Sequence, residues 1–87
     1  MTPHWSITVD ATRTYTIILE PAEEGGFIVS VPALPEVCTE GDTEAEALAM
    51  ARDAIELVIA SRRERGEFIP VETAAPLLHK VTVAVAA

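Results

Sequence analysis

Apolar and polar residues alternate along two stretches near the start of the chain, residues 15–20 and residues 27–31. In an extended strand, alternate side chains point to the same face, so each stretch has one apolar face. The apolar faces consist of Tyr15, Ile17 and Leu19 in the first stretch and of Phe27, Val29 and Val31 in the second. The intervening residues 23–26 end in a glycine pair, which adopts positive φ without steric penalty. The pattern predicts an antiparallel hairpin with one buried face.

A third strand is predicted over residues 36–40, after a turn bracketed by Pro32 and Pro35. Proline has no N–H to donate to a sheet, so both prolines favour the turn over the strands. The three strands together form an antiparallel meander.

A long helix follows the third strand. Thr43 and Glu46 have the spacing of a capping box, and Gly66 is a typical helix stop. Basic residues near the end favour the negative pole of the helix dipole, and they are Arg62, Arg63 and Arg65. An apolar stripe at helical spacing consists of Leu48, Ala51, Ile55, Val58 and Ile59. We expect this stripe to pack on the sheet.

The two ends of the chain add weaker strand signals. Residues 78–85 alternate and predict a final strand, and placing it beside the first strand makes the crossover right-handed. The predicted fold is therefore α+β, with a β-β-β-α-β order, a sheet order of 3-2-1-4 and the helix on one face. Residues 1–14 form an N-terminal extension in which residues 5–9 predict a short extra strand, and residues 15–87 form a single domain.

One helix covers only one face of such a sheet. The second face carries Ile18 and Ile28, and a chain of 87 residues builds only a small core. We therefore predict that this face or an edge strand is buried in a homo-oligomer, either a dimer or a tetramer.

Charge is distributed unevenly along the chain, which has a net charge of −8. Lys and Arg are absent between Arg13 and Arg52. A surface without bases disfavours nucleic-acid binding, because that binding depends on Lys and Arg displacing counterions. Two interpretations stay open: a solvated face that keeps the protein soluble, and a surface for a basic protein partner. The candidate partner-binding residues are Glu20, Glu23, Glu24, Glu36, Glu40 and Asp42.

Catalytic and metal-binding patterns are weak in this sequence. A metal-dependent nuclease needs convergent carboxylates, yet residues 15–19 and residues 77–87 contain none. His4 and His79 lie far apart without a nucleophile beside either, and Cys38 is the single cysteine. We expect no catalytic residue, metal or cofactor, and we expect Cys38 to be a small buried side chain in a strand.

Targeting and membrane signals are also weak. The first residues lack the basic and apolar regions of a signal peptide, and no apolar run approaches about 18 residues. We expect a cytoplasmic protein that does not bind membranes.

The order of these motifs resembles the HicB family of type II antitoxins. The resemblance spans residues 15–71 and rests on Tyr15, on Glu24-Gly25-Gly26-Phe27, on Val31-Pro32-Ala33-Leu34-Pro35 and on Thr39-Glu40-Gly41-Asp42-Thr43 before the helix. Residues 35–38 depart from the family pattern, since Pro-Glu-Val-Cys replaces the more typical Pro-Gly-Cys. The resemblance implies a partial ribonuclease H-like fold.

The same resemblance implies a function and a partner. HicB-like antitoxins silence a small basic HicA-type toxin, which has a double-stranded-RNA-binding-like fold and cleaves messenger RNA, by occluding it. Longer members append a DNA-binding module after the final strand, whereas this sequence stops at Ala87, so we expect no appended DNA-binding domain. Two alternatives remain, a metal-dependent ribonuclease of ribonuclease H-like fold and an orphan oligomeric binding module without a toxin.

Overall fold

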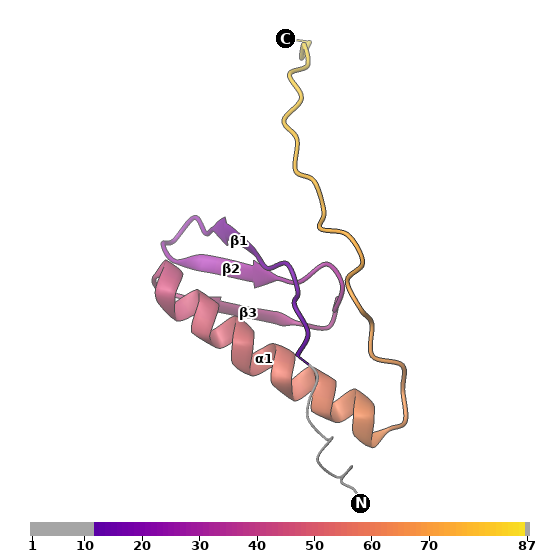
Figure 1. Ribbon diagram of the computed structural model, residues 1–87. Coiled ribbons are helices and arrows are strands. Elements are labelled where there is room, and N and C mark those ends of the chain that lie inside the picture. Colours follow the sequence, from indigo (N-terminus) through magenta and orange to yellow (C-terminus); the bar gives the residue numbers. More distant parts are fainter. Residues whose placement is uncertain (1–11, 87) are drawn as a thin grey trace, which may run out of the picture.

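The computed structural model describes residues 12–86, and the strand predicted over residues 5–9 lies outside this range. A three-stranded antiparallel sheet with the order β1-β2-β3 packs on one long helix (Figure 1). The elements are β1 (Ile18–Pro21), β2 (Phe27–Ser30), β3 (Cys38–Gly41) and α1 (Glu44–Glu64). The expected α+β class and the antiparallel meander are confirmed.

The strand register confirms the predicted faces of the hairpin. Leu19 lies opposite Val29, and Val29 lies opposite Thr39, so these three residues form one row across the face that meets α1. In the connecting loop, Gly25 and Gly26 have φ values of 102° and 77°. Both glycines therefore take the left-handed conformation that the hairpin turn requires.

The helix begins and ends where its capping signals predict. The Thr43 side chain accepts a hydrogen bond from Glu46 N (3.0 Å), and Glu46 Oε1 accepts one from Asp42 N (2.5 Å). After the last turn, Gly66 has a φ of 69° and its N–H donates to the Arg63 carbonyl oxygen (3.1 Å). Side chain and backbone thus satisfy some of the free groups at each end of the helix.

The core lies between α1 and the sheet and consists of two small clusters. Val29, Ala47 and Ala51 form the first, at the N-terminal half of α1. The second is built on the β2–β3 loop and the C-terminal half of α1, and it contains Val31, Leu34, Val37, Ile55, Val58 and Ile59. The prediction that Leu48 joins this stripe is wrong, because Leu48 is 44% exposed. Ala47 and Ala51 occupy the line of α1 that faces the sheet, which leaves Leu48 on its flank.

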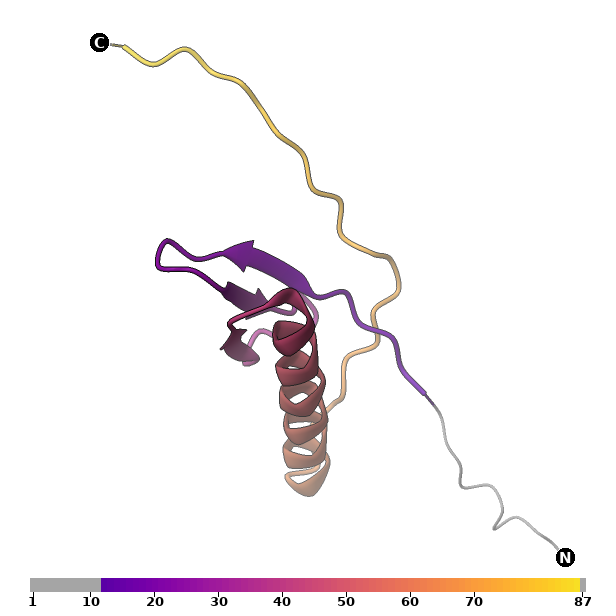
Figure 2. The same ribbon diagram turned by 90° about the vertical axis from the view of Figure 1, so that its left-hand side faces the viewer.

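The predicted final strand is also wrong for this chain. Residues 78–85 form no strand and are exposed, so the sheet order is 3-2-1 without a fourth member. After α1, the chain turns back toward β1 and then leaves the sheet (Figures 1 and 2). Within one chain, β1 is therefore an edge strand with no neighbour on its outer side.

Two contacts hold the returning chain where it passes the start of β1. Tyr15 Oη donates to the Pro70 carbonyl oxygen (2.6 Å). Thr16 donates to the Glu72 carboxylate through both N (2.7 Å) and Oγ1 (2.6 Å), and these bonds hold the pKa of Glu72 below its ordinary value. We call these contacts the β1 clamp. The clamp fixes the chain beside residues 15–16, upstream of β1, and the segment that follows points away from the sheet.

We predict that Gly41→Ala destabilises the fold. A Cβ at Gly41 would lie 2.6 Å from Ala47 Cα and closer still to Ala47 N. Because these neighbours are backbone atoms of α1, they yield only if the helix moves away from β3, and such overpacking typically costs about 1–3 kcal/mol. Urea unfolding followed by circular dichroism measures the loss in free energy of unfolding.

The control is Ala45→Ser, which adds one atom to an exposed side chain in the first turn of the same helix. We expect it to change the free energy of unfolding by less than about 0.5 kcal/mol. Equal stability of Gly41→Ala and the wild type would contradict the close approach of β3 and α1.

Candidate partner-binding surface

The sheet face opposite α1 is open to solvent. Glu20 lies opposite Ile28, and Ile28 lies opposite Glu40, so an apolar side chain stands between two carboxylates across the three strands. Ile28 is 45% exposed. A second row consists of Ile18, Ser30 and Cys38. We call these two rows the outer face.

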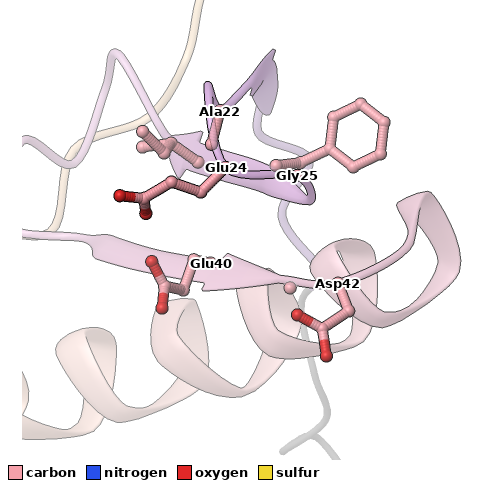
Figure 3. Close-up of a pocket in the computed structure, with 8 residues that line it drawn as sticks. Ala22, Glu24, Gly25, Glu40 and Asp42 are labelled. Atoms are coloured by element: carbon pink, nitrogen blue, oxygen red, sulfur yellow. The ribbon is translucent and has the colours of Figure 1, made fainter.

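The β1–β2 hairpin and the end of β3 form a shallow depression at the edge of the outer face, with a volume of about 300 Å³. Its carboxylates come from Glu24 on the hairpin and from Glu40 and Asp42 at the end of β3 (Figure 3). The remaining lining residues are Ala22, Gly25, Phe27, Ile28 and Gly41. The structure therefore brings together three acids that are up to 18 positions apart in the sequence (24 to 42).

Most of the predicted acids gather at this end of the sheet. Glu20 is next to the last residue of β1, and Glu23 is exposed on the hairpin beside Glu24. Neighbouring strands lie about 4.8 Å apart, so the strands bearing Glu20 and Glu40 are separated by about 10 Å. An ion above the middle strand would lie about 5 Å from each outer strand, which is within the Debye length of about 8 Å at physiological ionic strength, so both charges would act on it. We call Glu20, Glu23, Glu24, Glu40 and Asp42 the acidic rim.

Glu36 has a different environment from the acidic rim. Its carboxylate accepts two hydrogen bonds from Arg62, from Nε (2.7 Å) and Nη2 (3.0 Å). These bonds lower the pKa of Glu36 from its ordinary 4.5 to about 2. Arg62 Nη1 also donates to the Phe68 carbonyl oxygen (2.8 Å), so the pair ties the β2–β3 loop to the end of α1. The sequence offered no signal for this pair, because 26 positions separate its members.

Arg65, at the end of α1, also has partners within the chain. Arg65 binds the Glu67 carboxylate through Nε (2.8 Å) and Nη2 (3.0 Å), and it donates to Ser61 Oγ. The contact with Arg65 holds the pKa of Glu67 below its ordinary value. Together with the Glu36–Arg62 pair, this arrangement agrees with a structural role for the basic last turn.

The prediction that Cys38 is buried is wrong. Cys38 does lie in a strand, but its side chain is exposed. The cause is the register: Cys38 pairs with Ser30 on the outer face, whereas the next residue, Thr39, lies in the row that meets α1.

Residues 12–86 contain no group of three or more His, Cys, Asp or Glu side chains placed to hold a metal ion. Over the same range, no helix is long and apolar enough to cross a membrane. The outer face is characterised by exposed apolar area and negative charge.

Comparison with known proteins identifies the family. Residues 15–82 match the family described as HicB_like antitoxin of bacterial toxin-antitoxin system. The chain belongs to the HicB-like antitoxin family. This match extends the resemblance past residue 71 into the exposed C-terminal segment.

Individual HicB-like relatives agree with this family. Antitoxin HicB 1 of Photorhabdus laumondii is 49% identical over 57 residues, which cover 66% of this chain and 37% of the relative. Antitoxin HicB of Escherichia coli K12 is 42% identical over 57 residues, covering 66% of this chain and 41% of the relative. A UPF0150 protein of Thermoplasma acidophilum is 42% identical over 60 residues, covering 69% and 87%. This chain thus spans about two fifths of the named antitoxins it matches.

We predict that Glu36→Gln lowers the thermal midpoint of this HicB-like chain at neutral pH, because it removes the charge that Arg62 binds. The folded-state pKa of Glu36 is about 2, below its ordinary 4.5, so its contribution to stability is present above pH 4.5. This contribution is lost as the pH falls toward 2. The gap between wild type and variant should therefore shrink over that range in thermal melts followed by circular dichroism.

Glu40→Gln is the matched control, since it removes an exposed carboxylate that lies on the outer face. We expect its midpoint to stay within about 2 °C of the wild type at neutral pH. If Glu36→Gln melted at the same temperature as the wild type both at neutral pH and near pH 2, the ion pair would contribute nothing to stability.

Proposed function

We propose that this chain acts as an antitoxin that neutralises a basic HicA-type toxin by covering it with the outer face and the acidic rim. The observation that carries the proposal is the row in which Glu20 and Glu40 flank the exposed Ile28. An apolar centre bordered by charge is the usual composition of a protein-binding patch.

Charge gives the surface its specificity. Residues 14–51 contain the whole acidic rim and no Lys or Arg, so a partner meets one sign of charge across this region. Such a field speeds the approach of a basic protein and penalises acidic ones. A toxin that binds messenger RNA has basic groups placed for phosphates, and carboxylates of the rim occupy those groups in place of RNA.

Inhibiting the toxin by covering it requires only that this chain bind it. We propose that the three strands and α1 form a partial ribonuclease H-like fold that has kept its sheet for recognition. In this proposal the carboxylates make ion pairs with the toxin, and the chain performs no reaction. The toxin is silenced because its RNA site is covered.

The experiment is a binding measurement with a purified basic HicA-type toxin. We predict that Glu20→Lys combined with Glu40→Lys raises the Kd by about a hundredfold in calorimetry, because attraction becomes repulsion at the centre of the contact. In cells, the same double variant should fail to restore growth when it is co-expressed with the toxin.

The control is Glu56→Lys combined with Glu64→Lys, which makes the same charge change at exposed positions on α1. The control therefore measures the effect of net charge alone, and we expect it to raise the Kd by no more than about threefold. Equal weakening by both double variants would show that only total charge matters, and full binding by Glu20→Lys/Glu40→Lys would refute the outer face as the contact.

A further inference from the structure

The C-terminal segment of the chain, residues 73–86, is extended and makes no strand with its own sheet. We call this segment the tail. Its large apolar side chains are mostly exposed, with fractions of 83% for Leu77, 71% for Leu78, 81% for Val81, 69% for Val83 and 84% for Val85. Such exposure is costly in water, so the tail has the composition of a strand that lacks its neighbour.

The alternation of the tail defines one face to be buried. From residue 80 onward, Val81, Val83 and Val85 occupy odd positions, whereas Lys80, Thr82 and Ala84 occupy even ones. Leu78 and His79 precede this alternating stretch and do not follow its pattern. In an extended chain these sets point to opposite sides. The odd side is therefore suited to a core, and the even side is suited to solvent.

The sheet offers an unpaired edge along β1. Ala22 N donates to the Gly26 carbonyl oxygen (2.9 Å), which shows that the backbone of Ala22 faces β2. By alternation, Ile18 and Glu20 also face β2, whereas the N–H and C=O groups of Ile17 and Leu19 point outward. Pro21 falls on the same outward side, which is the position where an edge strand tolerates proline. Such an edge is a template for another strand.

The apolar side of the tail matches the inner side of this edge. The side chains of Ile17 and Leu19 pack against the core cluster but stay half-buried. Their exposure arises because α1 packs mainly on β3, and less on β2, which leaves the inner side of β1 at the border of the core. A strand beside β1 with valines on its inner side would complete this border.

Charge favours this chain as its own partner. The tail carries Lys80 and no acid, whereas β1 carries Glu20 and leads into the acidic hairpin. The tail is thus the one long exposed stretch of the described chain that complements the acidic edge.

The course of the tail points to a second copy. The β1 clamp fixes residues 70–72 beside the start of β1, and the tail then leaves the sheet (Figures 1 and 2). The radius of gyration is 17.5 Å, against about 12 Å for a compact chain of this length. Every copy therefore presents one free strand and one free edge, and two copies satisfy both through a twofold axis.

We propose that this chain forms a strand-exchanged dimer in which the tail of each copy pairs with β1 of the other. Each sheet then has four strands, and the fourth is supplied by the second copy. Pairing at the edge of β1 leaves Ile28 and Glu40, which lie on β2 and β3, uncovered in this dimer.

The first experiment measures the mass of the full chain by sedimentation at micromolar concentration. We expect a dimer for the wild type and a monomer for Val81→Asn combined with Val83→Asn, which makes the inner side of the tail polar. The matched control is Thr82→Asn combined with Ala84→Asn on the other side of the tail, and it should remain dimeric. A monomeric wild type, or a dimer that survives Val81→Asn/Val83→Asn, would overturn the proposal.

The second experiment separates exchange between copies from folding back within one copy. In a Cys38→Ser background, one chain carries Glu20→Cys and a longer, tagged chain carries Thr82→Cys. After the two are mixed, unfolded and refolded together, a short bismaleimide should link one chain of each kind. A chain carrying both substitutions should likewise give linked pairs. Linkage confined to single chains would show that the tail pairs with its own β1, and linkage that appears only with added toxin would show that the tail serves that partner. Either result would refute the dimer.

Discussion

The contact between Gly41 and Ala47 is the constraint on which the rest of this structure depends. Gly41 ends β3 and is buried against the backbone of the first turns of α1, where no Cβ fits. This approach places Ala47 and Ala51 directly under Val29. Small side chains at these positions let the helix axis lie close to the sheet, and the larger residues farther along α1 then fill the wider space below the β2–β3 loop.

That constraint also decides which surface is free for function. Because α1 is the single helix of residues 12–86, it covers one side of the sheet and leaves the outer face to solvent. The strand register then places Ile28 between Glu20 and Glu40, while the hairpin adds Glu24 at the border. This arrangement is the one on which the proposed binding of a toxin rests.

Ion pairs distinguish two acidic residues from those of the acidic rim. Glu36 and Glu67 have arginine partners at the end of α1, and their lowered pKa values reflect that contact. Glu36 lies in the same base-free stretch as the rim, but within residues 12–86 the ion pairs with arginine involve Glu36 and Glu67 and no acid of the rim. The ion pairs at the end of α1 therefore leave the charges of the rim without an arginine partner within residues 12–86.

The sequence by itself determined the local structure. The hairpin with Gly25 and Gly26, the cap at Thr43 and the stop at Gly66 depend on neighbouring residues, and all were predictable because backbone conformation and short-range hydrogen bonds decide them. Most of the acidic rim was also predictable, since charges in short loops and alternating strands stay exposed.

Only the tertiary structure decided the remaining features. The Glu36–Arg62 pair joins residues 26 positions apart, and the outward side of Cys38 follows from a register that no local pattern specifies. The course of residues 73–86 likewise depends on the β1 clamp, which alternation cannot reveal. Alternation predicts that a segment suits a sheet, but which edge it joins is decided by long-range contacts, because the same strand pattern fits any open edge.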